Sequence, residues 1–306
     1  MSKNLFFVAL IVSASGLVSA PGALLGGLIY GFSVAHPFEA ESRQLSKFLL
    51  QASVVALGFG MNLHEVVQAG RSGFLYTAGS ITFAMLVGLA LGHLIDVGPK
   101  SAFLISAGTA ICGGSAIAAV GPITDASEEE MAVSLGTVFV LNSIALFLFP
   151  VIGYLLHMSQ TQFGLWSALA IHDTSSVVGA TAKYGPTALA VGTTIKLTRA
   201  LWIIPLSFLT AMTTKNRSQV QWPWFIVLFF IATLLNSALP SLGSTFAALN
   251  RLGKSGLNVT LFLIGTGLNK QALKHVGVRP LIQGLLLWVI VGTGSLALIL
   301  FHLISI

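Results

Sequence analysis

Apolar segments near membrane-crossing length follow one another along this chain from end to end. A transmembrane helix needs about 20 predominantly apolar residues. We count eleven such segments, or ten if the first two form one span bent at Pro21. They lie near residues 5–20, 22–34, 47–63, 74–95, 101–123, 131–156, 163–184, 187–212, 224–239, 257–268 and 281–303. The pattern predicts an all-α polytopic membrane protein with 10 or 11 transmembrane helices, in a single integral membrane domain over residues 1–306.

The composition is also typical of a membrane protein, because 55% of the 306 residues are hydrophobic and only 8% are charged. A soluble domain carries about 25% charged residues. The net charge of +6 comes from cations in short loops beside apolar spans, where Lys and Arg orient helices, so we expect no nucleic-acid partner. With eleven spans, most Lys and Arg fall on the N-terminal side and the acidic run 128–130 falls on the opposite side. This excess places the N-terminus in the cytoplasm and the C-terminus outside.

Two apolar segments are interrupted by small and polar residues. Residues 109–117 read T-A-I-C-G-G-S-A-I inside the segment 101–123, and residues 168–176 read A-L-A-I-H-D-T-S-S inside the segment 163–184. Backbone groups freed by a break at membrane depth must be satisfied by protein or by a polar cavity. Paired broken helices near the bilayer midplane hold the bound solute or ion in many secondary transporters. We therefore expect both segments to be broken helices that share a polar site.

The first break supplies Cys112, Gly113, Gly114 and Ser115 as candidate binding residues. Adjacent glycines tolerate an unwound turn and let a ligand approach the backbone. Ser115 is then expected to cap the following half-helix, whose amide end favours an anion. The alternative is close helix packing through small residues. Cys112, the one cysteine of the chain, is expected to be a packed small residue and not a nucleophile, and no Cys/His cluster has zinc-site spacing.

The second break supplies His172, Asp173, Thr174, Ser175 and Ser176. Ionisable groups inside a span are costly and mark ion or proton pathways by default. We expect Asp173, with His172, to carry the coupling ion, and we expect His172 and the three hydroxyls to bind substrate. The alternative is that Asp173 only caps the second half-helix and that His172 reaches a backbone carbonyl.

Lys196 and Arg199 stand three residues apart within the next apolar segment. Two cations on one face of a span need a counter-ion or an anionic ligand, so we expect them to bind the anion or to neutralise Asp173. The alternative is that both side chains snorkel to an interface. Isolated amides, among them Asn142, are expected to make interhelical hydrogen bonds.

An internal similarity links the two ends of the chain. Residues 47–70 align without a gap on residues 254–277, sharing a G-x-G-x-N motif and a leading lysine, and each copy is followed by a long apolar span. By our count the copies lie seven spans apart and so have opposite orientations. Residues 47–95 and 254–303 are therefore expected to form an inverted repeat, which is a common architecture of alternating-access carriers. Chance similarity between apolar sequences is the alternative.

The strings T-A-I-C-G-G-S-A-I-A-A at 109–119 and H-D-T-S-S-V-V-G-A at 172–180 resemble the YeiH-type sulfate exporter family of bacterial inner-membrane proteins. This resemblance implies membership of the cation:proton antiporter and anion transporter superfamily. It further implies an elevator-type carrier with a core domain of crossed broken helices, a panel domain that often dimerises, and sulfate or an organosulfonate as substrate. Related folds cross these helices antiparallel, whereas our span count makes them parallel. Either one segment is re-entrant or a boundary is misplaced.

We therefore expect a secondary active transporter of a small anion that works by alternating access and is coupled to H⁺ or Na⁺. The alternatives are a cation/proton antiporter and a passive anion channel. An enzyme is not expected, because no nucleophile and base stand at a convincing spacing. No P-loop is present in the sequence, and we expect neither a cofactor nor a bound metal.

Overall fold

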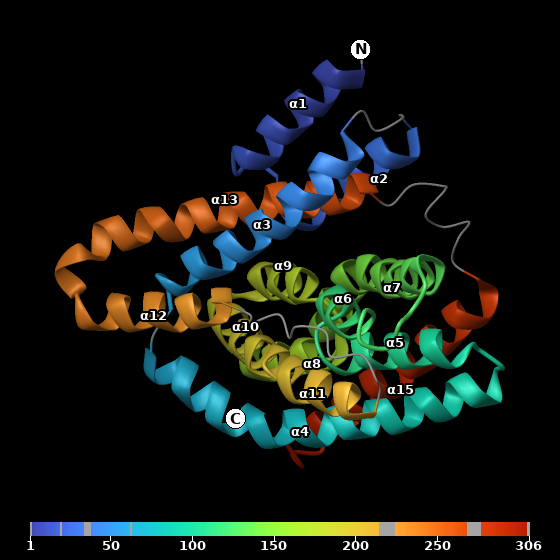
Figure 1. Ribbon diagram of the computed structural model, residues 1–306. Coiled ribbons are helices and arrows are strands. Elements are labelled where there is room, and N and C mark those ends of the chain that lie inside the picture. The colour runs from blue at the N-terminus through green and yellow to red at the C-terminus, as the bar shows by residue number, and fades with distance from the viewer. Residues whose placement is uncertain are drawn as a thin grey trace. The chain divides into compact units, whose positions relative to one another are not determined.

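The computed structural model describes residues 2–18, 20–33, 38–61, 63–213, 224–267 and 277–304. All regular elements within these ranges are helices (Figure 1). In chain order they are α1 (Ser2–Ala14), α2 (Ala20–Ser33), α3 (Glu39–Gly58), α4 (Leu63–Leu94), α5 (Pro99–Ala110), α6 (Gly114–Val120), α7 (Glu128–Leu155), α8 (Gln160–Ala170), α9 (Thr174–Tyr184), α10 (Pro186–Ala200), α11 (Ile203–Thr213), α12 (Trp224–Ala238), the short 3₁₀ helix η1 (Pro240–Leu242), α13 (Gly243–Gly267) and α15 (Val278–Leu300).

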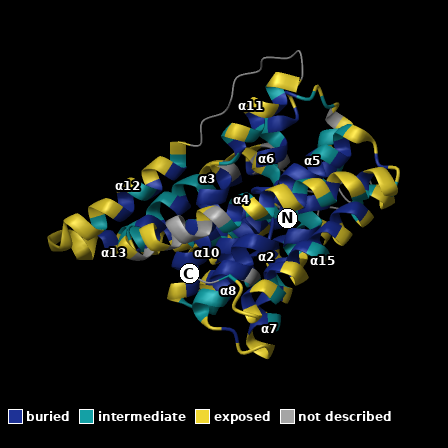
Figure 2. Cartoon of the chain, turned by 90° about the horizontal axis from the view of Figure 1, so that it is seen from below, coloured by how far each residue is buried: buried dark blue, intermediate teal, exposed yellow. Residues whose placement is uncertain are grey.

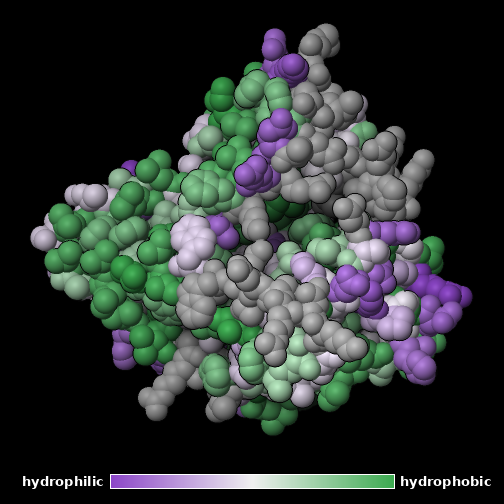
Figure 3. All heavy atoms as spheres, viewed as in Figure 1, coloured by the Kyte–Doolittle hydropathy of each residue, from purple (hydrophilic) through white to green (hydrophobic). Residues whose placement is uncertain are grey.

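Each apolar segment of the sequence contains a helix or a pair of helices, which agrees with a polytopic membrane protein. In the described residues, four helical stretches are long and apolar enough to cross a bilayer, or up to five if the bent α12–α13 pair counts as one span. The four are 76–94, 129–155, 186–213 and 278–300. Many of their exposed side chains are large and apolar, and hydrophobic residues cover much of the surface in view in Figure 3. The count of ten or eleven crossings includes the segments 101–123 and 163–184, which turn back as described below, and the number of the remaining crossings stays a prediction.

The chain forms two compact units. Unit 1 comprises residues 1–67 and 223–270, and unit 2 comprises residues 68–222 and 271–306. In unit 1, α13 packs along α2 and α3, and a cluster around Phe6, Tyr30 and Phe262 forms part of its core. The inverted repeat stays a prediction, because Asn62 in its first copy and residues 268–276 in its second lie outside the described residues.

The first broken segment folds back on itself within unit 2. Leu104 on α5 and Val120 on α6 pack in one cluster with Ile117, although a straight helix would hold them about 24 Å apart at 1.5 Å per residue. At the open end, the Lys100 ammonium donates to the carbonyl oxygen of Asp125. We call α5 and α6 hairpin 1, and residues 111–113 are its tip.

The second broken segment has the same form. The rings of Phe163 on α8 and Tyr184 on α9 stack with centroids 3.8 Å apart, and the Tyr184 hydroxyl donates to the carbonyl oxygen of Met158 at 2.7 Å. The start of α8 therefore lies beside the end of α9. We call α8 and α9 hairpin 2, and residues 171–173 are its tip.

The two hairpins approach the middle of α7 from opposite ends. Hairpin 1 has its open end near the start of α7, where Gly121 lies against Met131. Hairpin 2 has its open end near the far end of α7, where the rings of Tyr154 and Tyr184 stack with centroids 4.5 Å apart. α5 and α8 therefore point toward each other, and the conflict between parallel and antiparallel helices is resolved by re-entrant segments.

This topology corrects one expectation about charge. Hairpin 1 returns to the end from which it starts, so α7 begins beside Lys100. Ser127 caps α7 in a capping box with Glu130, which places the acidic run 128–130 at the Lys100 end instead of the opposite one. The prediction was wrong because apolar length alone does not distinguish a helix that crosses from one that turns back.

α10 lies along hairpin 2. It packs on both α8 and α9, and close approach is possible because Gly164 on α8 and Gly192 on α10 leave room for the facing backbone and side chains. Residues 188–200 are all buried, as the dark blue of α10 in Figure 2 shows. α11 continues beyond the hairpin tips and packs against α6. Any charged residue in the second half of α10 is thus held inside the protein.

Candidate functional site

The tips of the two hairpins touch each other. Gly113 adopts φ +68° and ψ −128°, a conformation that glycine tolerates and other residues rarely adopt. A Cβ atom placed on Gly113 would lie 3.3 Å from Cα of Asp173 and 3.3 Å from Cγ1 of Val138 on α7. The glycine at the first break therefore permits close contact with the acid at the second.

Asp173 caps the returning helix of hairpin 2. Its carboxylate accepts a hydrogen bond from the backbone N–H of Ser176 at 3.2 Å and from the hydroxyls of Ser175 and Ser176. A negative charge at this end of α9 is favoured by the helix dipole. The capping role considered for Asp173 is thus present, and its carboxylate occupies the amide end of α9.

Asn142, near the middle of α7, holds the same tip. Its Oδ1 atom accepts from the backbone N–H of His172 at 3.1 Å and from that of Asp173 at 3.2 Å. Its Nδ2 atom is buried and makes no hydrogen bond. From the sequence, Asn142 is expected only to make an ordinary interhelical hydrogen bond, and this contact with the hairpin tip is not predicted. The available signal was its position, because it is the amide in the apolar segment between the two breaks.

Lys196 and Arg199 on α10 meet the carbonyl ends of both hairpins. Lys196 Nζ donates to the carbonyl oxygen of Ile171 at 2.7 Å. Arg199 Nη1 donates to Leu169 O at 2.9 Å, and Arg199 Nε donates to Ala110 O. Both side chains are fully buried, so neither snorkels to an interface. Arg199 thus ties the end of α5 to the end of α8.

Buried polar atoms without a partner gather around these contacts. In the described residues they include Arg199 Nη2, both ring nitrogens of His172, Asn142 Nδ2, and the hydroxyls of Thr109, Ser167, Thr193 and Thr194. About 90% or more of buried polar groups in proteins are hydrogen-bonded, so such a group of exceptions indicates a place for water or a ligand. The imidazole of His172 does not reach a backbone carbonyl, which removes that alternative.

The remaining candidates of the first break are placed differently from one another. Cys112 is buried, Gly114 is half-buried and Ser115 is exposed. The residue that precedes α6 as its cap is Gly113, without a side-chain hydrogen bond, so the prediction that Ser115 caps this helix was wrong. Glycine takes that position because the tight turn requires a positive φ there. At the second break, Thr174, Ser175 and Ser176 are all buried.

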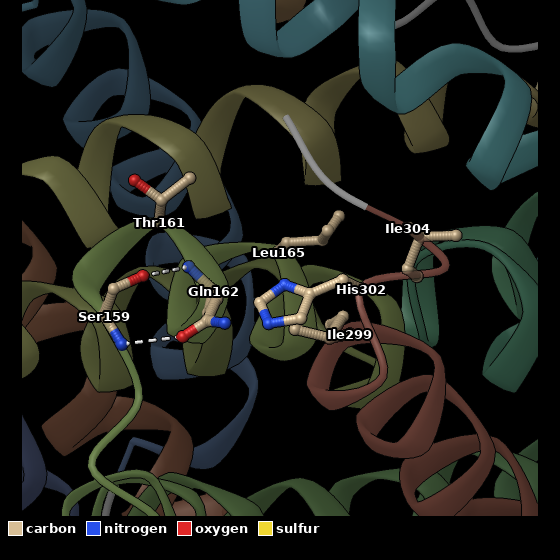
Figure 4. A pocket seen from close by; sticks show the side chains of 7 residues that line it. All are labelled: Ser159, Thr161, Gln162, Leu165, Ile299, His302 and Ile304. Carbon is tan, nitrogen blue, oxygen red and sulfur yellow. Dashed lines mark hydrogen bonds between the residues drawn. The ribbon is translucent and has the colours of Figure 1, made fainter.

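A pocket of about 320 Å³ lies elsewhere, at the open end of hairpin 2 (Figure 4). Its lining residues are Ser159, Thr161, Gln162, Leu165, Ile299, His302 and Ile304. Ser159 and Gln162 already bond each other in the capping box that starts α8. The pocket is separate from the hairpin tips, and we do not assign the substrate to it. No group of three or more metal-ligating side chains occurs among the described residues.

Comparison with known proteins identifies the family. The family model described as conserved hypothetical protein 698 matches residues 7–284. The chain belongs to this family. Members include a UPF0324 membrane protein of Bacteroides thetaiotaomicron, 49% identical over 94% of this chain and 88% of the relative. One from Geobacter sulfurreducens is 47% identical over 97% of this chain and 96% of the relative. No solved structure matches the chain.

Proposed function

We propose that this membrane protein is a secondary active transporter of a small anion that works by alternating access. The observation that carries the proposal is the meeting of two re-entrant hairpin tips at the middle of α7, surrounded by buried polar atoms that lack partners. Irregular backbone at membrane depth is tolerated where it lines a site or is buried in protein. Substrate sites of secondary transporters are built from such broken helices.

The chemistry of the tips favours an anion. Arg199 Nη2 and Asn142 Nδ2 are unpartnered donors, and hydroxyls and the imidazole of His172 can donate as well. Two buried basic side chains, Lys196 and Arg199, stand in the same region as one acid, Asp173. An oxyanion would satisfy several of the unpartnered donors at once. Cys112, Gly113, Gly114, Thr174, Ser175 and Ser176 would complete the surroundings, and the exposed Ser115 would act on the approach to the site.

Asp173 is the coupling acid in this proposal. It lies at the contact between the tips, is half-buried and is bonded to groups of its own hairpin. Uptake or release of H⁺, or binding of Na⁺, at this carboxylate would change the charge of the site together with the solute.

The two-unit organisation supports an elevator-type mechanism. Both hairpins and α10 belong to unit 2, so a rigid movement of that unit would carry the whole site. The substrate class, sulfate or an organosulfonate, comes from the resemblance to the YeiH-type sulfate exporters, as does a homodimer. The lipid bilayer is the bacterial inner membrane, with the N-terminus in the cytoplasm.

Uptake into proteoliposomes tests the proposal. Purified protein is reconstituted, and radiolabelled sulfate, an alkanesulfonate, bicarbonate and a short carboxylate are offered under pH or Na⁺ gradients. We expect saturable uptake of one anion class and acceleration by the same anion inside the vesicles. Flux without saturation or counterflow would indicate a channel. Na⁺- or Li⁺-dependent proton flux without any anion would indicate a cation/proton antiporter.

A further inference from the structure

The carbonyl ends of broken helices are natural cation sites. In secondary carriers, unwound carbonyls and half-helix C-terminal ends coordinate the coupling Na⁺ or H⁺. Here three such oxygens, on Ala110, Leu169 and Ile171, lie at the ends of α5 and α8 where the hairpins turn. Each already accepts a hydrogen bond from a basic side chain of α10.

The burial of Lys196 and Arg199 determines whether a cation can bind at these three carbonyl oxygens. Lys196 and Arg199 are 0% exposed, so bulk water does not screen their charges. A guanidinium keeps its charge inside proteins. Coulomb repulsion between like charges grows as the local dielectric falls. A Na⁺ at these carbonyls would have to displace the two donors and stand beside the charge of Arg199.

We propose that Lys196 and Arg199 are the resident basic groups of the hairpin ends, that no Na⁺ binds at these carbonyls, and that H⁺ on Asp173 is the coupling ion. This inference rests on the proposed function for its coupling part only. Asp173 takes a proton on one side of the membrane and releases it on the other, and no further reactant is needed. The titratable and charged groups around it are Lys196 on α10, Cys112 at the tip of hairpin 1 and His172 beside it. From α7 it meets the neutral Asn142.

Thermal unfolding of the purified protein tests whether Lys196 and Arg199 occupy the carbonyl oxygens and exclude Na⁺. Melting temperatures are compared in NaCl, LiCl, KCl and choline chloride at equal ionic strength. We expect the same value in all four salts, because the carbonyls are already satisfied. A rise specific to Na⁺ or Li⁺ in the unaltered protein would overturn the inference, since a ligand that binds only the folded state raises its stability.

Two variants at one position sharpen the test. Lys196→Ala removes the donor at Ile171 O and is expected to melt lower by the same amount in all four salts, because the charge of Arg199 still repels Na⁺ beside the vacated oxygen. Lys196→Arg keeps a basic group and is expected to lose less. Recovery of Lys196→Ala specifically in Na⁺ or Li⁺, or an unchanged melting temperature in that variant, would overturn the inference, and if it does not fold, the unaltered protein still decides.

A transport experiment distinguishes failure of this inference from failure of the proposed function. In proteoliposomes, anion uptake should follow an imposed pH gradient in Na⁺-free buffer and should not respond to a Na⁺ gradient. Uptake driven by Na⁺ alone would overturn H⁺ coupling. Failure of all anion uptake would reject the proposed function together with the coupling, while the melting experiment would still report whether the carbonyls are occupied.

Discussion

At the scale of single residues, Asp173 has both a structural role and the proposed role in ion coupling. Its carboxylate caps α9, and its backbone N–H is held by Asn142 on α7. Asparagine caps helices about as well as aspartate, but it carries no titratable charge. One substitution can therefore remove the charge and keep the cap.

We predict that Asp173→Asn folds with stability within about 1 kcal/mol of the unaltered protein and loses gradient-driven anion uptake. Uptake in proteoliposomes and thermal unfolding measure the two effects. The matched control is Ser159→Ala, which removes the cap of α8 at the opposite end of hairpin 2. It should cost about 1 kcal/mol of stability and leave uptake in place. Normal gradient-driven uptake by Asp173→Asn would remove the coupling role.

Gly113 gives a second prediction at this scale. Gly113→Ala forces a side chain into a left-handed backbone position and toward Asp173, so we expect a loss of about 1 to 3 kcal/mol in the free energy of unfolding. Chemical or thermal unfolding measures it. Gly79→Ala on α4 is the control, because a Cβ there meets nothing within 4 Å. Equal stability of the two variants would contradict the described turn at residue 113.

At the scale of elements, the sequence predicted where the helices break but not how the chain continues. The glycines at 113–114 and the polar run at 172–176 interrupt apolar segments, and such residues favour an end to a helix. A hairpin and a broken crossing can have the same apolar composition. The hydrogen-bond partners of Lys196 and Arg199 could not be predicted from the sequence, because backbone carbonyls have no sequence signature. Only the fold shows which carbonyls come together.

Cysteine labelling tests the hairpin topology. In a Cys112→Ala background, cysteines at Lys100 and Asp125 should react with a membrane-impermeant reagent from one side of the membrane. Cysteines at Thr161 and Lys183 should react from the other side. Reaction of positions 100 and 125 from opposite sides would show that this segment crosses the membrane, contrary to hairpin 1.

At the scale of the whole molecule, the distribution of charge in unit 2 is the basis of the proposed orientation. Lys100 and Arg279 lie at the same end of this unit, where Arg279 pairs with Asp96 at 2.7 Å. α15 runs from that end to the open end of hairpin 2, where His302 lines the pocket in Figure 4. An excess of Lys and Arg marks the cytoplasmic side. The chain therefore approaches its C-terminus on the outer side in the proposed orientation.

A reporter fused after Ile306 measures this orientation. Alkaline phosphatase, which folds in the oxidising space outside the inner membrane, should be active there, and green fluorescent protein fused at the same place should stay dark. A fusion after Asp125 should give the reverse pair of signals. The reverse result at both positions would invert the orientation, and the same signal at both would contradict the topology of unit 2.

The central claim is that the two hairpin tips together hold a small anion, and ligand-induced thermal stabilisation tests it most directly. Purified protein is melted with sulfate, sulfonates, bicarbonate and carboxylates at equal ionic strength, alongside Asn142→Ala and a control, Asn236→Ala, whose amide in unit 1 bonds the carbonyl oxygen of Met61. We predict that one anion class stabilises the unaltered protein and Asn236→Ala, by about 2.7 kcal/mol at 100 times its Kd, and stabilises Asn142→Ala much less. Equal stabilisation of both variants, or none of the unaltered protein by any anion, would contradict the account.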